Sequence, residues 1–169
     1  MDSAGVLQWR DSYDAAGILP DSVPPPDLVA EAARADCLIA SDLPRAIASA
    51  ERLAPGSTPR ISPLMREMYL DLPRWVVARW PLRVWEVCIT AHWFVRSWQG
   101  GIATPEELRR AADAVESLEQ TSRDAATTVV VTHGAFRRLL AMRLVDRGWT
   151  ALARTGGYAN WSAWRFRSS

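Results

Sequence analysis

The chain has 169 residues, of which 49% are hydrophobic and 23% charged, as is typical of one globular domain that can bury a substantial core. Its formal net charge of +1 excludes bulk electrostatic recruitment of nucleic acid or of an acidic partner. The positive charge is carried by arginine, and the sequence contains no lysine. Cys37 and Cys88 lie in apolar segments without metal-ligand spacing, so we expect reduced thiols, no metal site and no cofactor.

The sequence offers no evident targeting or membrane segment. Its first residues lack the basic region and apolar run of a signal peptide. The most apolar stretch, Val84–Val95, is interrupted by Glu86 and His92 and is too short to span a bilayer. We therefore expect a cytoplasmic location and no membrane partner.

The first part of the chain alternates helix and strand signals. Residues 1–26 are expected to be irregular, because Pro24, Pro25 and Pro26 cannot lie inside a helix or a central strand. Pro44 fits the first turn of a helix, where a missing N–H costs nothing. The elements expected in order are a helix capped by Asp27 and running to about Ala35, a buried strand at Cys37–Ala40, a helix at Leu43–Leu53, a short strand at Arg60–Leu64 and a loop at Met65–Pro73.

The second part begins with a tryptophan-rich segment, Trp75–Trp98, which Pro81 divides. We expect two helices there, forming core, a lid or a partner surface. The elements expected in order are the second of these helices at about Leu82–Ser97, a helix capped by Thr104 and running to about Arg123, a strand at Thr127–Val131, a helix to about Arg147 and an edge strand at Tyr158–Phe166. This alternation predicts a single domain over residues 1–169, a three-layer α/β/α sandwich with a mostly parallel sheet.

Two predicted strand-to-helix junctions share one layout. Arg45 lies in the first turn of the helix after one strand, and His133 lies in the turn after the other, beyond Thr132. If the two strands are neighbours in a parallel sheet, both side chains reach the crevice at its carboxyl edge, where such sheets bind ligands. An arginine fork, a histidine and helix N-termini suit a phosphoryl group, and Gly134 allows close backbone approach. A structural histidine and a solvated arginine remain the alternatives.

These junctions resemble the histidine phosphatase superfamily, which includes the phosphoglycerate mutases. The resemblance covers nearly all of the chain. It rests on Ser41 with Arg45-Ala46, on Arg66-Glu67, on His133-Gly134, on the segment Trp9, Tyr13-Asp14 and Ala16-Gly17, on Gly148-Trp149 and on an aromatic final strand at Tyr158–Trp161. The resemblance implies a phosphomonoester hydrolase acting on a phosphorylated small molecule or phosphoprotein. It also implies that Arg45, His133 and Gly134 bind the phosphate, with His133 and Glu67 catalytic and Glu67 the proton donor.

The sequence departs from that family at one decisive point. The family's first strand ends in Arg-His-Gly, whose histidine becomes phosphorylated, and this chain contains no such motif; its only other histidine is His92. We therefore expect that the first central strand, beside the strand leading to His133, is missing, because of an incorrectly chosen start codon or a degenerate, inactive member. The functional alternatives are a phosphatase lacking its nucleophile, a non-catalytic anion-binding domain, and an interaction protein that uses the tryptophans. Oligomeric state is open.

Overall fold

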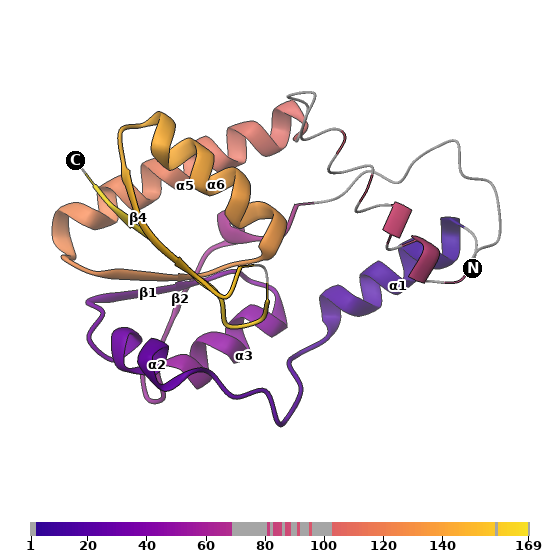
Figure 1. The fold of residues 1–169 in the computed structure, drawn as a ribbon, viewed down its shortest axis with the longest axis horizontal. Coiled ribbons are helices and arrows are strands. Elements are labelled where there is room, and N and C mark those ends of the chain that lie inside the picture. Colours follow the sequence, from indigo (N-terminus) through magenta and orange to yellow (C-terminus); the bar gives the residue numbers. More distant parts are fainter. Residues whose placement is uncertain are drawn as a thin grey trace.

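The computed structural model describes residues 3–68, 81, 83–85, 87, 88, 91, 95, 103–157 and 159–168. Within these residues, the α-helices are α1 (Ser3–Ala15), α2 (Pro26–Ala32), α3 (Pro44–Leu53), α5 (Pro105–Asp124) and α6 (Gly134–Asp146). The strands are β1 (Cys37–Ala40), β2 (Arg60–Ile61), β3 (Thr128–Val131), β4 (Thr150–Thr155) and β5 (Ala163–Arg167), and a 3-10 turn, η1, spans Pro63–Met65. Figure 1 shows their arrangement.

Strand β1 is the centre of a three-stranded parallel sheet with the order β2-β1-β3. In register, Ile39 of β1 lies opposite Arg60 of β2 and Val130 of β3. Helices α2 and α3 cover one face of this sheet, and α5 and α6 cover the other (Figure 1). The three-layer α/β arrangement predicted from the sequence is therefore confirmed.

The two cores follow from the alternation of side chains along β1. Leu38 and Ala40 pack into a cluster with α2 and α3, whereas Ile39 points to the opposite cluster with α5 and α6. Ile39 is fully buried, which stabilises the fold by about 1.5–3 kcal/mol relative to an exposed position. Because β1 is packed on both faces, it also positions Ser41 and Asp42, which follow directly after its carboxyl end.

The edge of β3 that faces away from β1 has no strand paired to it among the described residues. All four β3 residues are only partly buried, whereas a parallel strand covered by helices is normally buried on both faces. Strands β4 and β5 form a separate antiparallel pair, yet Ala163 packs on the α2–α3 cluster and Phe166 on the α5–α6 cluster. Strand β5 thus packs against both hydrophobic clusters but is not hydrogen-bonded to β3. An additional central strand at the open edge stays a prediction.

The expectation that residues 1–26 are irregular is wrong, because α1 occupies Ser3–Ala15. This helix has no buried apolar stripe that a sequence pattern could show. It contains a Trp9–Tyr13 pair at helical spacing, whose rings stack with centroids 5.5 Å apart. Its carboxyl end is also held by Arg45 of α3, which contacts Tyr13 and Asp14. Tertiary contacts therefore add to a local helical preference.

Smaller corrections concern element boundaries. Helix α2 begins at Pro26 and ends at Ala32, so Asp27 lies in its first turn instead of capping it. The strand expected at Arg60–Leu64 is limited to Arg60–Ile61, because η1 begins at Pro63. The edge strand expected at Tyr158–Phe166 is β5, at Ala163–Arg167, and its exposed partner β4 was not predicted.

Other boundaries are confirmed. Strand β1 spans Cys37–Ala40 as predicted, and β3 begins one residue later than predicted. The side chain of Thr104 accepts the backbone N–H of Glu107 at 3.2 Å and so caps α5 as expected.

Most of the tryptophan-rich segment lies outside the described residues. The excluded part contains His92 and every tryptophan of the segment except Trp85. Residues 83–85, 87, 88, 91 and 95 are helical, in the region of the second predicted helix, and Trp85 is fully buried. In the part of the chain that the structure describes, no helix is long and apolar enough to cross a membrane.

Candidate active site

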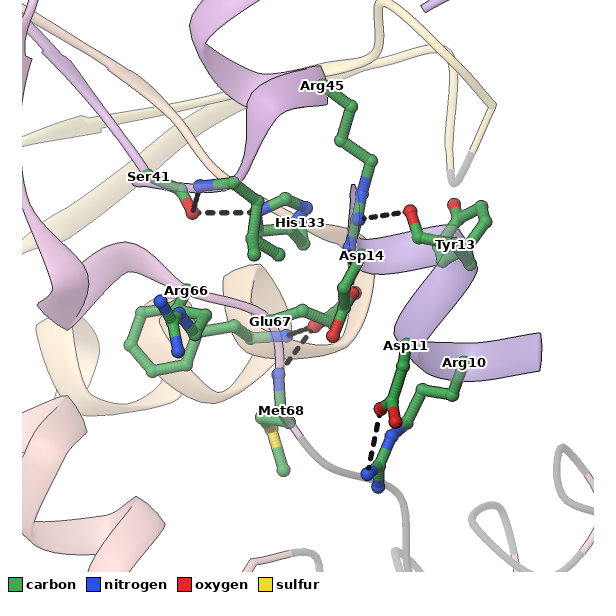
Figure 2. A network of polar contacts seen from close by, with 12 residues as sticks. Arg10, Asp11, Tyr13, Asp14, Ser41, Arg45, Arg66, Glu67, Met68 and His133 are labelled. Atoms are coloured by element: carbon green, nitrogen blue, oxygen red, sulfur yellow. Dashed lines mark hydrogen bonds and ion pairs between the residues drawn. The ribbon is translucent and has the colours of Figure 1, made fainter. Parts of the chain in front are cut away.

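The two strand-to-helix junctions meet at the carboxyl edge of the sheet, as predicted. Ala40 of β1 and Val131 of β3 are register partners, and the Ser41 N–H donates to the Val131 carbonyl at 2.9 Å. Two residues further on, His133 Nε2 lies 2.9 Å from Ser41 Oγ (Figure 2). The contact joins residues 92 positions apart in the chain, so the parallel pairing of β1 with β3 creates it.

His133 is a buried, neutral histidine. It occupies the residue before α6 and is only 9% exposed. The pKa of His133 is lowered from its ordinary 6.5 to about 4, mainly by burial and then by the nearby positive charge of Arg45, against an opposing effect of Asp42. The imidazole therefore carries no charge at neutral pH. A neutral ring can still donate one N–H to an anion, with Ser41 holding its other polar contact.

Arg45 projects from the first turn of α3 beyond the end of β1. Its Nη1 donates to the Tyr13 carbonyl oxygen at 3.0 Å, and its Nη2 donates to Asp14 Oδ1 at 3.1 Å (Figure 2). The guanidinium also lies over the Tyr13 ring, 4.4 Å from its centroid. The charge of Arg45 lowers the pKa of both His133 and Glu67, so the three predicted groups share one electrostatic environment.

Glu67 places its carboxyl group at the N-terminus of α6. Its Oε1 accepts the N–H of Phe136 and the N–H of Met68, each at 2.9 Å, and its Oε2 accepts the Ala135 N–H at 3.5 Å. Burial nevertheless raises the pKa of Glu67, because desolvation outweighs these bonds. A carboxyl group that keeps its proton to a higher pH than usual suits general-acid chemistry. Gly134 follows His133 directly and is the first residue of α6.

The loop that carries Glu67 is fixed by two arginines whose contacts sequence reasoning missed. Arg66 Nε donates to Asp42 Oδ1 at 3.0 Å, which ties the loop to the end of β1. Arg110 of α5 donates to the carbonyl oxygens of Leu64, at 3.0 Å, and Arg66, at 2.6 Å, while pairing with Glu107. Its i,i+3 pair with Glu107 is local, but nothing local in the sequence indicates the carbonyl acceptors of Arg110, which lie more than forty residues away.

Over the described ranges, no three His, Cys, Asp or Glu side chains gather as a metal-binding group. The polar groups at this edge of the sheet are an arginine, a neutral histidine, a helix N-terminus and a protonatable carboxyl group. Groups of these kinds are typical of anion-binding sites, and they lie at the edge where parallel sheets of α/β proteins bind ligands.

A comparison with protein-family models identifies the family of this α/β protein. The family model of the histidine phosphatase superfamily (branch 1) matches residues 27–168. The chain therefore belongs to the histidine phosphatase superfamily. The matched range contains Arg45, Glu67 and His133, while α1 lies before it. Neither the curated proteins nor the solved structures contain a significant match to the chain.

Proposed function

We propose that this domain is of the phosphomonoester hydrolase type that works through a phosphohistidine, that Arg45, His133 and Gly134 bind the phosphoryl group, and that the given chain lacks the attacking histidine. The observation that carries the proposal is the 2.9 Å contact between His133 and Ser41, which places the His-Gly turn beside the helix that presents Arg45. The Arg45 guanidinium can donate two parallel hydrogen bonds to a phosphoryl group. Neutral His133 can donate one N–H without taking up a second proton. The substrate is a phosphorylated small molecule or a phosphoprotein.

Glu67 would supply the proton in this chemistry. In the family's reaction, a histidine nitrogen attacks phosphorus in line, a nitrogen–phosphorus bond forms, and the ester oxygen–phosphorus bond breaks. The leaving alkoxide takes the carboxyl proton and departs as an alcohol, and water then attacks the phosphohistidine to release phosphate. The raised pKa of Glu67 keeps that proton available, and its bonds to the Phe136 and Met68 N–H groups stabilise the carboxylate left behind.

The printed sequence contains no Arg-His-Gly motif to supply the attacking histidine. His133 is already occupied with Ser41 and serves as a binding group in this proposal. A strand paired to the open edge of β3 would bring its last residues to the same carboxyl edge, because neighbouring parallel strands end side by side. We therefore propose that the 169-residue chain binds phosphate but does not turn over phosphomonoesters.

A second candidate is a non-catalytic domain that uses the same groups only to bind anions. The absence of the motif favours it. Both candidates require phosphate binding, and they differ in whether turnover appears once a nucleophile is provided. The interaction role of the tryptophan-rich segment and the cytoplasmic location stay predictions.

The test of the shared claim is a thermal shift with inorganic phosphate. The wild-type melting temperature should rise with phosphate concentration, because a ligand bound only to the native state stabilises it. Arg45→Ala should abolish the rise, while Arg109→Ala, an exposed arginine on α5, should keep it. An equal rise in all three proteins would assign phosphate binding elsewhere. Rapid p-nitrophenyl phosphate hydrolysis that His133→Ala abolishes would overturn the predicted lack of turnover.

A further inference from the structure

The carboxyl end of α1 occupies the donor groups of Arg45. The Tyr13 carbonyl oxygen and the Asp14 carboxylate each accept from a different terminal nitrogen of the guanidinium, and the Tyr13 ring covers one of its faces. The Arg45 side chain is only 12% exposed and that of Asp14 24% exposed. Figure 2 shows the Arg45 side chain extending to these two residues. The arginine assigned to phosphate therefore already holds a carboxylate of its own chain.

The chemistry of these contacts is that of an anionic ligand. A carboxylate and a phosphate oxygen accept the same guanidinium N–H groups, so the two compete for Arg45. The carbonyl groups at the end of α1 add partial negative charge, because the carboxyl end of a helix is the negative pole of its dipole. Asp14 and Tyr13 thus present to Arg45 the charge that a phosphoryl group would bring.

The described side chains of helix α1 lie at the surface of the protein. None of its described side chains is buried, and Tyr13 is 50% exposed. Figure 1 shows α1 projecting from the layered body, with its carboxyl end nearest α3. Releasing the Tyr13–Asp14 end of α1 from Arg45 would therefore uncover little buried side-chain surface at that end, and weakly buried segments open at low free-energy cost.

We propose that the Tyr13–Asp14 end of α1 is an autoinhibitory contact that competes with phosphate for Arg45. This inference rests on the proposed phosphate-binding role of that arginine. The domain exchanges between a closed state, in which Asp14 is bound to Arg45, and an open state, in which Arg45 is free to bind phosphate. The apparent affinity for phosphate is reduced in proportion to the open fraction.

The test compares inorganic phosphate binding by wild type, Asp14→Asn and Asp11→Asn in calorimetric titrations. Asp14→Asn removes the competing charge and keeps the side-chain size, and we expect it to tighten phosphate binding about tenfold, which corresponds to about 1.4 kcal/mol. Asp11→Asn is the matched control, because Asp11 lies on the same helix, 72% exposed, and its ion pair is with its neighbour Arg10. It should bind phosphate like wild type.

Combining each variant with Arg45→Ala separates the two claims. If phosphate binding depends on Arg45 but Asp14→Asn binds no tighter than wild type, the autoinhibitory contact is refuted and the phosphate site stands. Weaker binding by Asp14→Asn would refute it too, since Asp14 would then orient Arg45. If neither wild type nor Asp14→Asn shows Arg45-dependent binding, the proposed function itself fails.

A second readout follows α1 directly. Saturating phosphate should accelerate hydrogen exchange at the α1 amides by releasing its carboxyl end, and Asp14→Asn should show that faster exchange without phosphate. Unchanged exchange in both cases would contradict the competition.

Discussion

Buried, neutral His133 makes the stability of the fold sensitive to mild acid. The unfolded chain takes up a proton on this histidine near pH 6.5, whereas the native protein resists protonation until about pH 4. Between these values the unfolded state binds more protons, so the free energy of unfolding falls as the pH falls. The stability is complete above pH 6.5 and is lost progressively towards pH 4.

The size of this loss follows from the two pKa values. One pKa unit corresponds to about 1.36 kcal/mol, which gives a loss of about 2 kcal/mol at pH 5 and about 3 kcal/mol at pH 4. His133→Gln removes the titration and keeps a polar side chain. Subtracting its unfolding free energy from that of wild type cancels the titration of the carboxyl groups that both proteins share.

Urea unfolding of both proteins at several pH values from 7 to 4 measures this difference. We expect the wild type to lose about 3 kcal/mol relative to His133→Gln over that range. A difference that stays constant to within about 0.5 kcal/mol would show that His133 titrates like an exposed imidazole. That result would refute its burial beside Arg45.

Three further predictions concern Glu67, the Arg110 contacts and the cap of α5. Glu67→Gln keeps an oxygen that accepts the Phe136 N–H and removes a carboxylate that burial destabilises. At pH 8 the raised pKa of Glu67 lowers the stability of the wild type most, so the variant should be at least as stable in urea unfolding. A loss above about 1 kcal/mol would contradict this. Arg110→Ala should cost about 2–3 kcal/mol, because the partly buried Leu64 and Arg66 carbonyl groups lose their charged donor. Thermal unfolding of this variant beside exposed Arg109→Ala measures the cost, and equal losses would show that Arg110 does not stabilise the loop. Thr104→Ala should cost about 1 kcal/mol through the lost cap of α5, and no change in melting temperature would disprove that role.

The sequence predicts best the elements whose signals are local. The apolar run at Cys37–Ala40 and the β-branched run before His133 define two strands, and the Thr104 cap defines the start of α5. The meeting of Arg45 with the His133 turn also follows, because parallel neighbours end at one edge of the sheet. These features depend on patterns within about ten residues or on a general rule of topology.

The contacts that sequence reasoning missed depend on distant partners. Asp14 and Arg45 are 31 positions apart, and no periodicity relates them. Strand β4 is exposed along its whole length, so it lacks the burial pattern by which strands are recognised. The bonds from Glu67 to the N-terminus of α6 depend on the path of the loop, which Arg110 fixes from another helix. Such pairings are visible only in the folded chain.

The most direct test of the proposed phosphate site is a side-chain NMR titration of His133 with inorganic phosphate. A phosphate bound between Arg45 and His133 places negative charge beside the ring, which favours the protonated imidazole. We predict that the pKa of His133 rises from about 4 towards its ordinary 6.5 as phosphate saturates the protein, more readily in Asp14→Asn and not in Arg45→Ala. Unchanged His133 resonances at high phosphate concentration, in wild type and in Asp14→Asn alike, would contradict the site.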